Sequence, residues 1–287
     1  MDTDLRHRTI ATNGVNLHVV EAGPEDGRLV ILLHGFPEFW YGWRKQIGPL
    51  AAAGFRVLVP DQRGYNLSDK PKGVRPYNLD DLALDVIGLI GGAGREKACV
   101  VAHDWGGAVG WWLGMKFPDR VERLALLNMP HLSVMRRAIL KNPAQRRRVS
   151  YMFFFQLPWL PERALSKENW KYLAKALQAT SRPGTFSEED LAHYREAWSR
   201  PGAITGMLNW YRAGLRTRPR PPKSSRVSVP TLLIWGPKDR ALLRELAQPS
   251  IDRCDDGRLV FLEEATHWVQ HEEPEEVNRL LIDFLSR

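Results

Sequence analysis

The stretch Cys99-Val100-Val101-Ala102-His103-Asp104-Trp105-Gly106-Gly107 decides the fold of this chain. An apolar run ends in a carboxylate, two glycines follow, and residues 108–117 suit a helix, so the order predicts a strand, a tight turn and a helix. Small residues at 102 and 106 leave room where the backbone doubles back. A turn of this kind holds its tip residue, here Asp104, in a strained conformation above a sheet.

Asp104 also carries chemical information, because the tip of such a turn is usually serine and no Gly-x-Ser-x-Gly occurs in the chain. A serine that displaces a group from a saturated carbon becomes an ether, which water does not easily cleave. A carboxylate becomes an ester, which an activated water can cleave. Asp104 therefore favours displacement at an sp3 carbon followed by ester hydrolysis. The alternative is an aspartate that only caps the helix, whose amino end favours negative charge.

The composition indicates a large core. The 287 residues are 44% hydrophobic, which suits one large domain or a domain with an insertion. No apolar run approaches the ~20 residues of a membrane span, and the start, MDTDLR, does not resemble a secretory signal. Two cysteines, Cys99 and Cys254, are too few for a disulfide framework or a zinc site. We therefore expect a reduced, cytoplasmic setting and no membrane partner.

The chain is basic, with a net charge of +8. Much of the excess lies at residues 136–137, 146–148 and 216–226. A basic patch can bind nucleic acid, but no nucleic-acid-binding motif accompanies this one. We interpret the charge as a solvated surface and expect no nucleic-acid partner.

Strands and helices alternate along most of the chain, which predicts crossover connections and a parallel sheet. The expected strands are a hairpin of edge strands at 8–22, then 29–33, 56–60, 98–102, 121–127, 229–236 and 258–262. The expected helices that cover the sheet are 43–53, 79–91, 108–117 and 275–285. Reactive groups in such folds gather at the carboxyl ends of the strands, where His34, Asp61, Asp104 and Asn128 fall.

Residues 132–228 interrupt this alternation, because they show helical patterns without a convincing strand. The expected helices are 132–140, 150–155, 166–177, 187–198 and 202–215, and a proline-rich linker follows at 218–223. We therefore expect an α/β core formed by 1–131 and 229–287, with 132–228 inserted as an all-helical cap.

Two further residues complete a possible catalytic group with Asp104. Asp239 follows the strand at 229–236, and His267 follows the last strand. The order nucleophile, acid, base is that of an α/β-hydrolase triad. Among other histidines, His271 lies in an acidic stretch that we expect to be exposed.

The chain resembles the α/β-hydrolase-fold epoxide hydrolases over nearly its whole length. The motifs that match are His34-Gly35-Phe36-Pro37-Glu38, His103-Asp104-Trp105-Gly106-Gly107, Phe155-Gln156-Leu157-Pro158-Trp159-Leu160-Pro161-Glu162, Leu208-Asn209-Trp210-Tyr211-Arg212, Trp235-Gly236-Pro237-Lys238-Asp239 and Thr266-His267-Trp268. The resemblance implies a mostly parallel sheet flanked by helices, an inserted helical cap, and two cap tyrosines, Tyr211 and Tyr151, that face the nucleophile. Opening an epoxide releases an alkoxide, and a tyrosine hydroxyl, with an ordinary pKa of about 10, still holds a proton to give it.

These residues predict an enzyme that converts an apolar epoxide and water to a vicinal diol through an ester on Asp104, with a role in detoxification. The backbone N–H groups of Phe36 and Trp105 are expected to form the oxyanion hole. Phe36, Trp105, Phe154 and Trp210 are expected to contact the substrate. The mechanism needs no metal or organic cofactor, and we expect a monomer or homodimer.

Two alternatives remain. A haloalkane or haloacid dehalogenase shares the Asp-His-Asp triad and the Trp after the nucleophile, but halide needs N–H donors rather than acids. The position of Phe36 is often Asn in haloalkane dehalogenases, and phenylalanine offers no side-chain donor. A binding protein without catalysis is the other alternative, and the intact triad argues against it.

Overall fold

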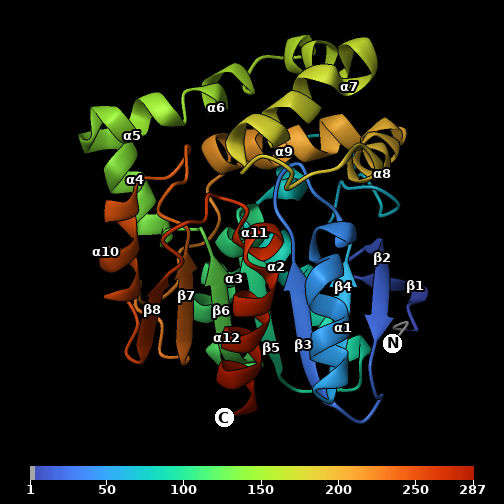
Figure 1. The fold of residues 1–287 in the computed structure, drawn as a ribbon, viewed down its shortest axis with the longest axis vertical. Coiled ribbons are helices and arrows are strands. Elements are labelled where there is room, and N and C mark those ends of the chain that lie inside the picture. The colour runs from blue at the N-terminus through green and yellow to red at the C-terminus, as the bar shows by residue number, and fades with distance from the viewer. Residues whose placement is uncertain (1–3) are drawn as a thin grey trace.

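A computed structural model of the protein describes residues 4–287. Within this range eight strands form one sheet in the order β1-β2-β4-β3-β5-β6-β7-β8 (Figure 1). The strands are β1 (Arg6–Thr12), β2 (Val15–Ala22), β3 (Arg28–Leu33), β4 (Phe55–Pro60), β5 (Ala98–His103), β6 (Val121–Leu127), β7 (Thr231–Trp235) and β8 (Gly257–Phe261). The helices that flank the sheet are α1 (Arg44–Ala52), α2 (Leu79–Gly92), α3 (Trp105–Lys116), α10 (Ala247–Ile251), α11 (Val269–Glu272) and α12 (Pro274–Ser286). The expected α/β-hydrolase architecture is confirmed.

The sheet is mostly parallel. Strands β3 to β8 pair with parallel neighbours, while β2 runs antiparallel to both β1 and β4. The prediction of a hairpin at 8–22 is confirmed, but its description as two edge strands is wrong for β2. All but one residue of β2 is buried, so this strand needs cover on both sides, and it lies inside the sheet. Of the two hairpin strands, only β1 is at an edge of the sheet, and most of its side chains are exposed or half-buried.

Alternate side chains of the central strands face two separate layers of core, as the pleat of a strand requires. Val30 and Leu32 of β3 pack in a cluster with side chains of α1 and α12. Leu29, Ile31 and Leu33 face the opposite side, where α2 and α3 contribute to a larger cluster. The sheet is therefore held rigidly between helices, and the loops at its ends are fixed in position.

A second group of helices covers one end of the sheet (Figure 1). It comprises α4 (Leu132–Lys141), α5 (Pro143–Arg148), α6 (Tyr151–Phe154), α7 (Leu160–Thr180), α8 (Glu188–Ser199) and α9 (Ala203–Arg216). Figure 1 shows α9 and α8 next to the core, and α5, α6 and α7 along the outer edge of the cap. Four 3-10 helices among the described residues complete the order: η1 (Trp40–Trp43), η2 (Arg75–Tyr77), η3 (Pro118–Arg120) and η4 (Arg244–Leu246).

The cap differs from the sequence expectation in two places. Helix α7 is longer than expected, and Glu168, Asn169 and Trp170 in its middle have left-handed backbone angles. This turn places Trp170 in the core, where its indole N–H donates to Ser199 Oγ at 2.6 Å. Helix α5 was not expected at all. Its start is nevertheless a favourable one, because the side chain of Asn142 accepts from two backbone N–H groups and proline follows.

None of the helices within residues 4–287 is both long and apolar enough to cross a membrane.

Candidate active site

The tip of the turn between β5 and α3 is Asp104, whose backbone angles are φ 49° and ψ −124°. Any residue other than glycine is strained at such backbone angles. The surrounding backbone holds it there. A Cβ on Gly106 would lie 2.3 Å from the carbonyl oxygen of Leu33, and one on Gly35 would lie 2.3 Å from Asp104 itself. Close packing of β3 and its loop against this turn therefore fixes the carboxylate above the sheet.

Two neighbours contact the carboxylate of Asp104 from different sides. The backbone N–H of Phe36 donates to Oδ1 at 2.8 Å, and Nε2 of His267 lies 3.5 Å from Oδ2. Burial alone would raise the pKa of this carboxyl. The hydrogen bond and positive charge of His267 outweigh burial, so the pKa of Asp104 lies below its ordinary value. The carboxylate is thus kept ionised.

His267 stands between two carboxylates. Its Nδ1 lies 2.7 Å from Oδ2 of Asp239, and its Nε2 faces Asp104. Burial opposes the charged imidazolium, but the charge of Asp239 and the hydrogen bonds to both carboxylates raise the pKa of His267 to about 10. In the resting protein, the imidazole therefore carries a proton at neutral pH.

Asp239 is buried and held by fixed donors. Its Oδ1 accepts the backbone N–H groups of Ala241 and Leu242 at 2.7 and 2.9 Å, and its Oδ2 accepts from Asn128 Nδ2 at 2.9 Å. Burial tends to raise its pKa, but His267 and these donors hold the pKa below the ordinary value. Asn128 comes from the end of β6, as the sequence predicted for a residue near the reactive groups.

The two predicted cap tyrosines lie together, and the charge of Asp104 acts on both hydroxyls. Tyr211 on α9 is buried, and Tyr151 on α6 keeps 38% of its surface exposed, with ring centroids 6.1 Å apart. Burial of its hydroxyl, with the charge of Asp104, raises the pKa of Tyr151. Burial also raises the pKa of Tyr211 well above its ordinary value, with contributions from Tyr151 and Asp104. Both phenols are therefore protonated at neutral pH.

The comparisons with known proteins agree with this geometry. Residues 28–274 match the model of the alpha/beta hydrolase fold family. The chain is 50% identical to the AB hydrolase superfamily protein YfhM of Bacillus subtilis, over 96% of both chains. It is 38% identical to epoxide hydrolase 4 of Homo sapiens, over 96% of this chain and 77% of that one. The chain belongs to the α/β-hydrolase-fold epoxide hydrolases.

A solved structure supports the same assignment for this epoxide hydrolase family member. The crystal structure of Bacillus megaterium epoxide hydrolase in complex with an inhibitor superposes with a TM-score of 0.88 at 31% identity. The alignment covers 98% of this chain and all of that one. The likeness extends over cap and core together.

The predicted substrate contacts of this family member occupy different environments. Phe36 and Trp105 pack edge-on against Tyr211, with centroids 5.2 and 5.0 Å away. Trp210 is buried, with its indole N–H donating to the carbonyl of Arg63 at 2.9 Å. Phe154 is exposed on the cap surface. Only Phe36 and Trp105 of the four are therefore brought directly against Tyr211 by these ring contacts.

The sequence prediction chose Phe154 rather than Phe155 as the cap phenylalanine that contacts the substrate. Its ring lies 5.6 Å from Phe36 and 5.0 Å from Tyr211, and it belongs to a small buried cluster with Tyr211 and Leu208. Three phenylalanines stand in a row at 153–155, and a short helix turns only one of them inward. The sequence shows the aromatic run but not which member packs against Tyr211.

A buried polar network behind His267 was also missed. The carboxylate of Glu38 accepts from Tyr194 Oη at 2.6 Å and from Gln270 Nε2 at 3.1 Å, and lies 2.7 Å from Nε2 of His271. The expectation that His271 is exposed is wrong, because this contact with Glu38 draws it into the core. His103 extends the network by donating from Nε2 to the carbonyl of His267 at 2.8 Å.

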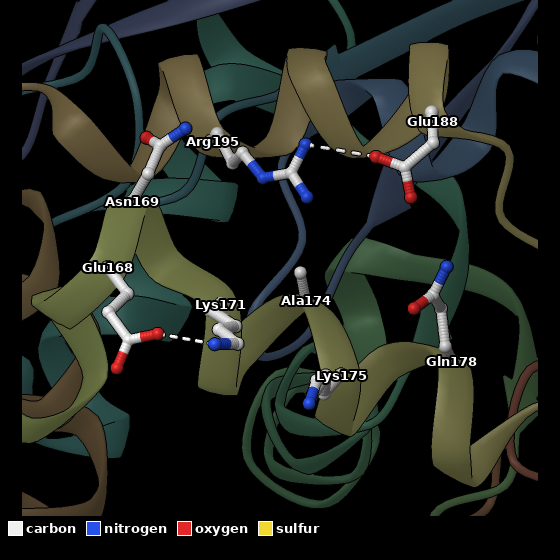
Figure 2. Close-up of a pocket in the computed structure, with 8 residues that line it drawn as sticks. All are labelled: Glu168, Asn169, Lys171, Ala174, Lys175, Gln178, Glu188 and Arg195. Carbon is white, nitrogen blue, oxygen red and sulfur yellow. Dashed lines mark hydrogen bonds and ion pairs between the residues drawn. The ribbon is translucent and has the colours of Figure 1, made fainter.

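A separate hollow lies between α7 and α8 on the cap (Figure 2). It has a volume of about 440 Å3 and is open to the surroundings. Figure 2 shows two ion pairs among its charged side chains, Lys171 with Glu168 and Arg195 with Glu188. None of its lining residues belongs to the Asp104 group, so we do not assign the reaction to this hollow.

Proposed function

We propose that this protein adds water to an apolar epoxide and releases a vicinal diol through a covalent ester on Asp104. The observation that supports this most strongly is the pair of protonated phenols, Tyr151 and Tyr211, within electrostatic reach of an ionised Asp104. A nucleophile with two acids beside it matches the needs of a ring whose leaving group is an alkoxide. The names of the relatives point to the same reaction.

In the first step, an oxygen of Asp104 attacks one epoxide carbon and the bond from that carbon to the ring oxygen breaks. Tyr151 and Tyr211 donate hydrogen bonds to the ring oxygen and give it a proton. The ring oxygen becomes the hydroxyl of a β-hydroxyalkyl ester. Ester formation removes the negative charge of Asp104, so the pKa of His267 falls, and the proton that it releases restores the tyrosine hydroxyl.

In the second step, neutral His267 takes a proton from water, and the oxygen of that water attacks the carboxyl carbon of the ester. The N–H groups of Phe36 and Trp105 stabilise the oxyanion. Phe36 already donates to Asp104, and Trp105 begins α3, where a backbone N–H has no partner within the helix. One such donor is worth roughly 3 kcal/mol in well-studied hydrolases. The diol leaves, and the carboxylate and imidazolium are restored.

The aromatic rings around Tyr211 indicate the substrate class. Phe36, Trp105 and Phe155 surround Tyr211 with aromatic rings, so we propose an apolar or aromatic epoxide. Removal of reactive epoxides of this class is the biological role that we propose.

A single turnover in heavy-oxygen water tests the covalent route. With enzyme in excess over styrene oxide, we expect one labelled oxygen in the carboxyl group of Asp104 and styrene glycol as product. Label in the diol alone would exclude the ester. Halide release from chloroalkanes or fluoroacetate, without diol from styrene oxide, would favour the dehalogenase alternative.

A further inference from the structure

The outer edge of the cap exposes an unusual number of large apolar side chains. Phe153 and Trp159 have 54% and 63% of their surface exposed, and Phe154, Leu157 and Leu160 are exposed beside them in the sequence. Phe153 and Phe154 end α6, Leu157 and Trp159 lie in the turn after it, and Leu160 begins α7. Figure 1 shows α6 and α7 along the outer edge of the cap. Scattered apolar residues are ordinary on a surface, but a contiguous exposed group marks an interaction site.

The same edge is strongly basic. Between residues 132 and 163 the chain has one acid, Glu162, which is paired with the buried Arg212 at 2.6 Å. The exposed cations of this segment are Arg136, Arg137, Lys141, Arg146, Arg147, Arg148 and Arg163. Opposing side chains of α5 and α6, such as Gln145 and Phe155, are buried. The inward side thus packs on the cap, and the outward side presents aromatic and cationic groups together.

The backbone conformation of Trp159 supports the interpretation of this surface as an interaction site. Trp159 has φ 51° and ψ −27°, a left-handed conformation that is strained for a bulky side chain. In this conformation the indole lies outward rather than in the core. A tryptophan beside arginines is the combination that membrane interfaces favour, because indole rings sit at the level of the lipid headgroups.

We propose that the outer cap face, defined as Phe153, Phe154, Leu157, Trp159 and Leu160 with Arg146, Arg147 and Arg163, docks on the surface of an anionic lipid bilayer. The aromatic side chains insert at the headgroup level, and the arginines contact lipid phosphates. Docking of this kind needs no membrane-spanning helix. It revises the expectation that the protein has no membrane partner.

Docking would also place the active site close to its substrates. Tyr151 belongs to the same short helix as Phe153, and its ring is partly exposed while its hydroxyl interacts with Tyr211. The proposed acid Tyr151 is therefore next to the outer cap face. Apolar epoxides dissolve in lipid, so a bilayer at this face delivers them directly. This consequence rests on the proposed function, whereas docking itself does not.

Vesicle sedimentation tests the proposal without turnover. The full chain is mixed with sucrose-loaded vesicles of 70% phosphatidylcholine and 30% phosphatidylglycerol, or of phosphatidylcholine alone. We expect binding to the anionic vesicles that weakens between 20 and 200 mM salt. Removing both charges in R146Q/R147Q is expected to lower the partition coefficient about fivefold for each arginine. F153S/W159S is expected to lower the partition coefficient at both salt concentrations, because salt does not screen the contribution of apolar side chains to binding.

Matched controls separate the outer cap face from general charge and hydrophobicity. R226Q/R258Q removes the same net charge from exposed arginines elsewhere, and L215S removes an apolar side chain that is 54% exposed. Both controls are expected to bind vesicles like the wild type. Hydrolysis of dissolved styrene oxide by R146Q/R147Q is expected to be unchanged, so a failure of docking is distinguished from a failure of the proposed function.

Three results would overturn the proposal. The first is a wild-type protein that does not sediment with anionic vesicles. The second is equal loss of binding in R226Q/R258Q and R146Q/R147Q. The third is a wild-type dimer in analytical ultracentrifugation that becomes a monomer in F153S/W159S, because a second copy of the chain would then cover this face.

Discussion

His267 and Asp104 are coupled across a gap of 3.5 Å between Nε2 of the imidazole and Oδ2 of the carboxylate. The contact lowers the pKa of the carboxyl and raises that of the imidazole. Each group therefore holds the other in its charged form. Esterification of Asp104 would remove one charge of the pair, so His267 becomes a base only after the ester exists. The geometry thus orders the two steps of the proposed reaction.

Replacing His267 separates the two steps. His267→Gln keeps the nucleophile but removes the base, so we expect the ester to form and persist. Intact-protein mass spectrometry after addition of styrene oxide should show one adduct per chain, and steady-state turnover should fall by about 10³-fold or more. In Asp104→Asn the adduct should be absent. An adduct on Asp104→Asn, or none on His267→Gln, would contradict the ester route.

The charge of His267 gives a second prediction. Its pKa of about 10 should appear directly as the imidazole titration in an NMR experiment. Asp104→Asn should lower this pKa, because it removes one of the two carboxylates that stabilise the imidazolium. Asp190→Asn, a change in a carboxylate on α8, should leave it unaltered. A titration of wild-type His267 near 6.5 would disprove the coupling.

The same shift makes stability depend on pH. The pKa of His267 is higher in the folded protein than its unfolded value of 6.5, so the imidazolium stabilises the fold fully below about pH 6.5. This contribution is lost as the pH rises toward about 10. Denaturant unfolding between pH 7 and pH 10 should therefore show a smaller loss of stability in Asp104→Asn than in the wild type. An equal loss in the two proteins would contradict the prediction.

The tyrosines are tested by removing only their hydroxyl groups. Tyr211→Phe and Tyr151→Phe should each slow ester formation from styrene oxide, by up to the 10²–10⁴-fold typical of a positioned acid. Rapid-quench measurement of the ester isolates this step from hydrolysis. Tyr172→Phe is a suitable control, because that phenol is exposed on α7. Unchanged ester formation in the double variant would show that another group protonates the ring oxygen.

The sequence predicted the fold and the candidate triad because local signals coincide there. An apolar strand, small residues and a carboxylate at 98–107 leave few alternatives to a tight strand-to-helix turn, and the structure has that turn. Asp239 and His267 each lie in the loop that follows a strand. The periodicity of the strand pattern and the end of each strand can both be read from neighbouring residues, so no long-range information is needed.

Long-range contacts limited the rest of the prediction. His271 looks exposed because acidic residues surround it in the sequence, but its partner Glu38 is more than two hundred residues away. The inward direction of Phe155 likewise depends on where α9 lies. The position of β2 inside the sheet depends on its pairing with β4, which no local pattern reveals.

Glu38 is predicted to be structurally important through this network. Its buried carboxylate faces His271, Tyr194 and Gln270, and the two histidines nearby hold its pKa well below the ordinary value despite burial. Glu38→Gln leaves these donors without a charged partner, so we expect a loss of about 3 kcal/mol in the free energy of unfolding. Glu188→Gln, at an exposed position, should change it by less than about 0.5 kcal/mol. Equal losses of unfolding free energy in the two variants would show that this network does not stabilise the fold.

Two glycines offer the sharpest test of the turn that carries Asp104. A Cβ on Gly106 would lie 2.3 and 2.5 Å from the carbonyl oxygens of Leu33 and His34, and backbone atoms cannot move aside as a side chain does. We expect Gly106→Ala to cost about 3 kcal/mol or more in stability. Gly91 of α2 has open space around its Cβ position, so Gly91→Ala should be neutral or stabilising by up to about 1 kcal/mol. Denaturant unfolding of the two variants measures both changes in stability. Ester formation by Gly106→Ala should also be slower, because moving β3 withdraws the N–H of Phe36 from Asp104. A Gly106→Ala variant as stable and active as Gly91→Ala would show that close backbone packing does not hold the nucleophile in place.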